Sequence, residues 1–141
     1  MLKDAASVKF VVLGHAPVPR GRGSITLAEK AWRTAVAEAA TEQIGPIEQA
    51  LVAGWPWLAV ALDFHFASMT TDVDNMPKPI LDTLFSPGPA NPNRLHLGDI
   101  TGVVFPLRDD SAVRELCLTK DLVGEELLGV SITIMESAER T

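Results

Sequence analysis

The strongest constraint on the fold is a stretch of strict alternation from Trp57 to Phe66. Large apolar side chains take every second position, and smaller or polar side chains take the positions between them. The first set is Leu58, Val60, Leu62, Phe64 and Phe66, and the second is Ala59, Ala61, Asp63 and His65. Because successive side chains of a strand point to opposite faces, this pattern predicts a β-strand with one apolar face.

Elements before this strand are indicated by local signals. The run from Val8 to Gly14 is rich in β-branched residues and is predicted to be a strand. A capping-box pattern, Thr26-Leu27-Ala28-Glu29, precedes a helical periodicity that Gly45-Pro46 is expected to stop. The first helix is therefore placed between these two signals.

After the alternating strand, Pro77 and Pro79 fit the first turn of a short second helix, because a helix tolerates proline there. A Pro/Gly-rich insertion is expected at about 86–108, with a short strand near 101–105. Two more strands, 113–120 and 128–135, are predicted to form a hairpin. The order β-α-β-α-β-β predicts an α+β fold, with two helices packed on a mixed β-sheet.

The composition predicts one domain covering 1–141, since 141 residues with 47% hydrophobic content suffice for one core. The sequence contains no apolar run of about 18 residues, which a membrane helix would need, and no signal-peptide pattern. A cytoplasmic protein without membrane association is expected. The single cysteine, Cys117, lies in an apolar-rich stretch and is predicted to be a buried structural thiol.

The formal net charge of −6 argues against general coating of nucleic acid, which depends on Lys and Arg. The N-terminal part is nevertheless basic. A Pro/Gly loop after the first strand carries Arg20 and Arg22, and the first helix carries Lys30 and Arg33 off its apolar stripe. These four residues are the predicted contacts for nucleic acid.

Residues 72–84 are where chemistry is most strongly indicated. In an extended backbone Asp72 and Asp74 leave the same face, and two such carboxylates suit a hard cation, Mg²⁺ or Mn²⁺. Lys78 falls in the first turn of the helix, where the macrodipole disfavours a cation. The alternative interpretation is a surface ion pair of Lys78 with Asp82, and an Asx cap from Asp74 or Asn75.

Two motifs resemble those of the RusA family of Holliday junction resolvases. The segment Asp72-x-Asp74-Asn75-x-x-Lys78, followed by Asp82-x-Leu84, is similar to the D-x-D-N-x-x-K-x-x-x-D-x-L segment of that family. The segment Asp109-Asp110-Ser111-Ala112-Val113, with Lys120 downstream, is similar to its D-D-x-Q-V/I strand start and lysine. The resemblance extends from about Lys9 to Met135, and departs from the family in the longer segment between the motifs and in Ala112.

The resemblance implies a RusA-like fold and a site assembled from both motifs. By this likeness Asp72, Asp74 and Asp110 hold the metal, and Lys78 contacts phosphate or the attacking water. Asn75 would orient the carboxylates, Asp109 would lie nearby, and Lys120 is a secondary candidate. A competing third acid is Asp99, which has His96 close by in the insertion.

The leading hypothesis is a Mg²⁺-dependent endodeoxyribonuclease acting on branched DNA such as Holliday junctions. A homodimer is expected because two strands must be cut at symmetry-related places. Two alternatives stay open: a non-cleaving protein that binds DNA structures, and a small nucleotide phosphohydrolase that uses the same acids.

Overall fold

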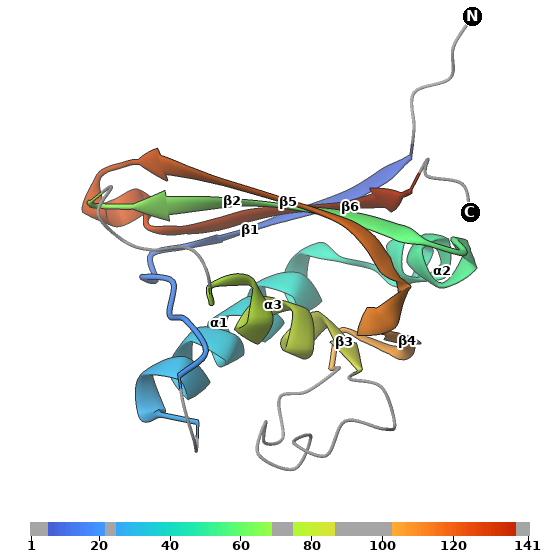
Figure 1. Ribbon diagram of the computed structural model, residues 1–141, viewed down its shortest axis with the longest axis horizontal. Helices are drawn as coiled ribbons and strands as arrows, with labels where there is room; N and C mark the ends of the chain where they lie inside the picture. The colour runs from blue at the N-terminus through green and yellow to red at the C-terminus, as the bar shows by residue number, and fades with distance from the viewer. Residues whose placement is uncertain (1–5, 22–24, 69–74, 87–102, 138–141) are drawn as a thin grey trace, which may run out of the picture.

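The protein combines a four-stranded sheet with three helices on one of its faces (Figure 1). The computed structural model describes residues 6–21, 25–68, 75–86 and 103–137. The strands of this sheet are β1 (Ser7–Leu13), β2 (Leu58–Phe66), β5 (Val113–Leu122) and β6 (Gly129–Glu136). Their order is β1-β6-β2-β5, with β5 parallel to β2 and the other neighbours antiparallel. The predicted α+β class and mixed sheet are confirmed.

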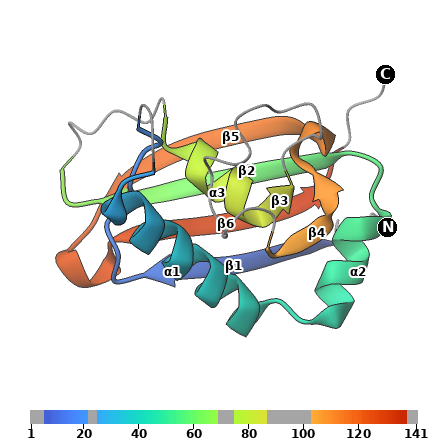
Figure 2. The ribbon, with the colours of Figure 1, turned by 90° about the horizontal axis from the view of Figure 1, so that it is seen from below.

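The helices are α1 (Leu27–Gln43), α2 (Pro46–Gly54) and α3 (Pro77–Leu84). Figure 2 looks onto the face that they cover, with α1 and α3 lying across the sheet and α2 at one end. Two helices were predicted, and α2 was missed. Gly45-Pro46 does end α1, but Pro46 also takes a first-turn position of α2, and the Glu48 carboxylate accepts a hydrogen bond from the Gly45 N–H at 2.8 Å. The same dipeptide therefore stops one helix and begins the next.

The alternation in β2 has the predicted effect. Its large apolar side chains are buried under the helices, and its other face stays partly exposed. The core consists of this face together with inward side chains of β1 and β6 and the apolar stripes of α1 and α3. Large buried members from these elements include Phe10, Trp32, Phe64, Ile80, Leu84 and Ile132.

The predicted hairpin of the last two strands is wrong. β5 pairs with β2 in parallel and never with β6, which lies on the other side of β2. Parallel strands need a crossover, and α3 with the following residues supplies it. The chain then turns across the end of β2, where the Val123 N–H donates to the Phe66 carbonyl at 2.9 Å.

A second, two-stranded sheet joins the two ends of the predicted insertion. The strands are β3 (Phe85–Ser86) and β4 (Phe105–Asp109), and they pair in parallel. The rings of Phe85 and Phe105 stack with centroids 5.6 Å apart. The predicted strand near 101–105 thus begins at Phe105, and residues 87–102 of the insertion lie outside the described part of the chain.

Cys117 corrects another prediction, because it is an exposed free thiol. It lies on β5 opposite Ala61, on the sheet face away from the helices. The apolar neighbours that suggested burial, Leu116 and Leu118, point to the other face. In the described residues, no helix combines the length and the apolar character that crossing a membrane would require.

Gly129 starts β6 at φ +148°, and a Cβ there would lie 1.7 Å from the Val12 carbonyl oxygen. Gly129→Ala should therefore destabilise the protein by roughly 1 to 3 kcal/mol or more, because the β1–β6 pairing must shift to relieve the contact. Gly54→Ala, at the last residue of α2, is the matched control: nothing lies near its added Cβ, so its stability should stay close to that of the parent. Urea unfolding measures both, and equal stability of the two variants would contradict the prediction.

Candidate active site

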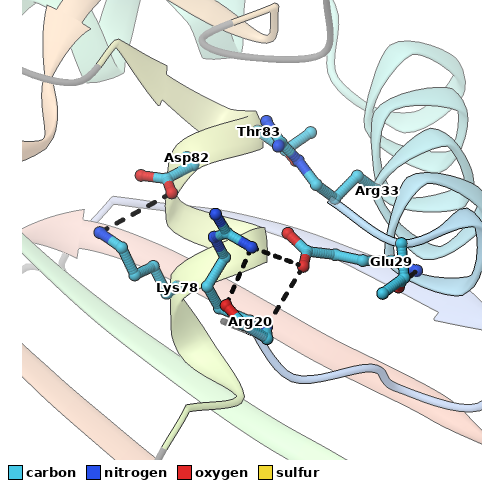
Figure 3. Close-up of polar contacts among 8 residues, drawn as sticks. Arg20, Glu29, Arg33, Lys78, Asp82 and Thr83 are labelled. Atoms are coloured by element: carbon cyan, nitrogen blue, oxygen red, sulfur yellow. Dashed lines mark hydrogen bonds and ion pairs between the residues drawn. The ribbon is translucent and has the colours of Figure 1, made fainter. Parts of the chain in front are cut away.

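Lys78 and Asp82 lie on neighbouring turns of α3, and the lysine is exposed whereas the aspartate is buried. Its apolar side chains Ile80 and Leu84 are fully buried against the sheet and α1. Lys78 Nζ lies 3.8 Å from Asp82 Oδ2 (Figure 3), and the lysine side chain is 54% exposed whereas that of Asp82 is 1% exposed. The i,i+4 ion pair of the alternative interpretation is therefore present, with one partner inside the molecule.

Burial raises the pKa of the Asp82 carboxyl, and the charges of Lys78, Arg33 and Arg20 offset part of this effect. Asp82 Oδ2 has no hydrogen-bond partner among the described residues. A buried carboxylate in this condition is costly to the fold unless a further partner satisfies it. The sequence had marked Asp82 as the partner of Lys78 and gave no sign of its burial.

The second motif forms a capped turn. β4 ends at Asp109, whose Oδ1 accepts a hydrogen bond from the Ser111 N–H at 3.0 Å, and a 3₁₀ turn follows at Asp110–Ala112. The Ser111 backbone hydrogen bond lowers the pKa of Asp109. The pKa of Asp110 is raised to about 6, first by burial and then by its hydrogen bond with Asp109 and the charges of Asp109 and Asp82.

The charges of Asp82 and Lys78 both act on Asp110, in opposite directions. The pairing of Ser86 with Asp109 between β3 and β4 brings the end of α3 beside the second motif, so residues of the two motifs, about thirty positions apart, lie within electrostatic range of each other. Asn75, with an exposed side chain, immediately precedes this helix region. Three predicted members of the site, Lys78, Asp110 and Asp109, thus share one neighbourhood, together with Asp82, which the sequence marked only as the ion-pair partner of Lys78 and as part of the first motif.

Four predicted residues lie outside the described part of the chain: Asp72, Asp74, Asp99 and Arg22. The choice between Asp110 and Asp99 as the third acid stays a prediction. Lys120 lies on β5 opposite Phe64. Its place is on the strand that follows the second motif, as the sequence indicated.

The predicted DNA contacts occupy different surroundings. Lys30 is exposed on α1, as expected. Arg33 is only 1% exposed, and its Nε donates to the Thr83 hydroxyl at 3.0 Å. Arg20 Nη1 lies 3.3 Å from Glu29 Oε1 (Figure 3). The structure does not place Arg33 on the surface where a phosphate contact was expected, because α3 covers its side of α1.

A separate cluster lies on the sheet face away from the helices. One ligand atom each from Asp63, His65 and Asp121 lies within 4.8 Å of the others, so this group could hold a metal ion. His65 Nε2 hydrogen-bonds the Ser131 hydroxyl at 2.8 Å, and its Nδ1 is enclosed without a hydrogen-bond partner in the described chain. The hydrogen bond with Asp63 raises the pKa of Asp121. The alternation in the sequence placed Asp63 and His65 on one face of β2, and no motif pointed to Asp121.

Comparison of the chain with protein-family models and with curated proteins found no match.

Asp82→Asn should raise the midpoint of thermal unfolding at neutral pH. Because burial raises the folded-state pKa of Asp82, its ionisation above the unfolded-state value of about 3.9 favours unfolding. Asparagine cannot ionise, so the gain should shrink as the pH falls toward about 4. Circular dichroism melts of parent and variant between acid and neutral pH measure this difference.

Asp109→Asn is the matched variant, for which we expect the opposite shift in the midpoint of thermal unfolding. The Ser111 hydrogen bond lowers the folded-state pKa of Asp109, so its stabilisation is present above the unfolded-state pKa and is lost as the pH falls through the folded-state pKa. This variant should melt lower than the parent at neutral pH and approach it in acid. Shifts of the same sign for the two variants would mean that burial does not determine the effect at Asp82.

Proposed function

We propose that the chain is a Mg²⁺-dependent endodeoxyribonuclease that hydrolyses phosphodiester bonds in branched DNA such as Holliday junctions. The observation that carries the proposal is the common neighbourhood of Lys78, Asp82 and Asp110. These residues come from the two motifs that resemble the RusA family. That family is also the source of the proposed substrate and of the homodimer.

The acids described fit a hard divalent cation. Asp110 is a partly buried carboxyl among other acids, with its pKa raised to about 6, and a cation beside it would offset that repulsion. In the proposal Asp110 would share the cation with Asp72 and Asp74, of which Asp74 directly precedes Asn75 in the sequence. When bound, Mg²⁺ would supply a nucleophilic water and stabilise charge on the reacting phosphate.

The remaining roles belong to side chains of the protein. Lys78 is half exposed and has three N–H donors, so it can contact a nonbridging phosphate oxygen while it stays beside Asp82. Asp82 would keep this ammonium group in position. Lys30, and Arg22 from the basic loop, would contact the DNA backbone.

One observation favours a second candidate, a small nucleotide phosphohydrolase with the same acids. Arg20 and Arg33 make contacts inside the molecule, which leaves fewer of the predicted cations for a long DNA strand. A nucleotide needs fewer phosphate contacts than a four-way junction. Hydrolysis of nucleoside triphosphates, measured beside junction cleavage, separates the two candidates.

Asp110→Asn should lower Mg²⁺-dependent cleavage of a labelled four-way junction by more than about 100-fold, since even a residue that only orients a metal ligand is worth about 10- to 100-fold. Binding of the junction should persist, because the variant loses a negative charge. Glu136→Gln, an exposed acid at the end of β6, is the control and should cleave at the parental rate. Parental cleavage by Asp110→Asn would exclude Asp110 as a metal ligand and direct attention to Asp99.

A further inference from the structure

Arg20 contacts α1 through its side chain (Figure 3) and the residue that leads into α3 through its backbone. Its guanidinium Nη1 donates to Glu29 Oε1 of α1 at 3.3 Å and to the Gly21 carbonyl at 3.0 Å. Its backbone N–H donates to the Asn75 carbonyl at 3.0 Å. The side chain is only 13% exposed. One residue thus holds the loop after β1 against both α1 and the residue that leads into α3.

Glu29 is arranged to receive this arginine. In a complete capping box its carboxylate would turn back to the Thr26 N–H, but only the other half is present, with Thr26 Oγ1 accepting from the Glu29 N–H at 3.1 Å. The carboxylate instead accepts from Arg20 and from the Gly21 N–H at 3.4 Å. It is 1% exposed, and its Oε2 has no hydrogen-bond partner among the described residues.

Burial of the Glu29 carboxylate carries a desolvation cost in free energy that an apolar side chain at this position would avoid. The arrangement gives directional contact to the loop, which an apolar side chain cannot give. Breaking the pair by removing Arg20 alone would leave the Glu29 charge buried without its partner. Glu29 therefore acts through the position of Arg20.

The start of α3 needs support from elsewhere in the fold. The helix has eight residues, and its N-cap residue, Met76, makes no side-chain capping hydrogen bond. Helices of this length are unstable in isolation. The bond from the Arg20 N–H to the Asn75 carbonyl acts at the residue that joins the D-x-D motif to the turn carrying Lys78.

We propose that Arg20 is a positioning residue of the candidate active site: clamped by the buried Glu29 carboxylate, it fixes the Asn75 backbone and thereby the start of the turn that carries Lys78. This inference rests on the proposed nuclease function. It assigns Arg20 an action through Asn75, in place of the direct phosphate contact that the sequence indicated.

The experiment compares Arg20→Ala, Glu29→Gln and the double variant, with Glu38→Gln as an exposed acid control on the same helix. Each single variant should lower kcat for junction cleavage by about 10- to 100-fold, because small displacements of reacting groups have effects of this size. The double variant should be no worse than Arg20→Ala, since both act through one contact. Arg20→Lys, which keeps the ion pair, should recover part of kcat.

The salt dependence of junction binding distinguishes positioning from phosphate contact. Arg20→Ala should keep the parental slope of log K against log salt, whereas Lys30→Ala, which removes an exposed cation, should reduce it by about 0.9. A reduced slope for Arg20→Ala with kcat unchanged would overturn the proposal. So would strictly additive effects of the two single variants.

Amide hydrogen exchange tests the contact without any catalytic readout. The amide of residue 20 should exchange faster in Arg20→Ala and in Glu29→Gln than in Glu38→Gln, while amides of β2 keep their protection. If the parent does not cleave DNA but these amides respond, the nuclease proposal fails and the positioning of the Asn75 backbone by Arg20 stands. Unchanged exchange at residue 20 would overturn the positioning role whatever the parent hydrolyses.

Discussion

The pairing of β2 on both of its edges is the constraint on which the rest of the structure depends. Every residue from Leu58 to Phe66 has a partner in β5, and nearly all have one in β6. The helices α1 and α3 pack on the apolar face of β2. The positions of both layers, the sheet and the helices, therefore depend on this strand. Because α3 follows β2 in the chain and β5 lies beside β2, Lys78 and Asp110 belong to the two ends of one crossover connection.

The sequence was sufficient for features that depend on local patterns. The alternation in β2, the Thr26 cap and the first-turn prolines of α3 each rest on neighbours a few residues away, and each is present in the structure. The missed α2 is instructive, since Gly45-Pro46 reads equally well as an end and as a beginning. The wrong hairpin has another cause: strand adjacency is decided by the whole sheet, and two consecutive strands can have a third placed between them.

In the candidate site too, local contacts could be predicted from the sequence and contacts made by tertiary packing could not. Lys78 with Asp82 could be expected from spacing alone, and so could the capping role of an aspartate before a turn. The burial of Arg33 could not, because its partner Thr83 is fifty residues away and only the packing of α1 on α3 brings them together. Exposed Cys117 and the cluster around His65 depend on which face of the sheet lacks helices, which no single strand reveals.

The short β3–β4 pair has a consequence for how this chain can vary. The stacked rings of Phe85 and Phe105 close the two ends of the intervening segment onto each other, beside α3. Once the ends of a segment are held together, doubling its length adds only about 0.6 kcal/mol of closure entropy. Chain closure therefore sets only a weak limit on the length of the segment between β3 and β4, next to the candidate site.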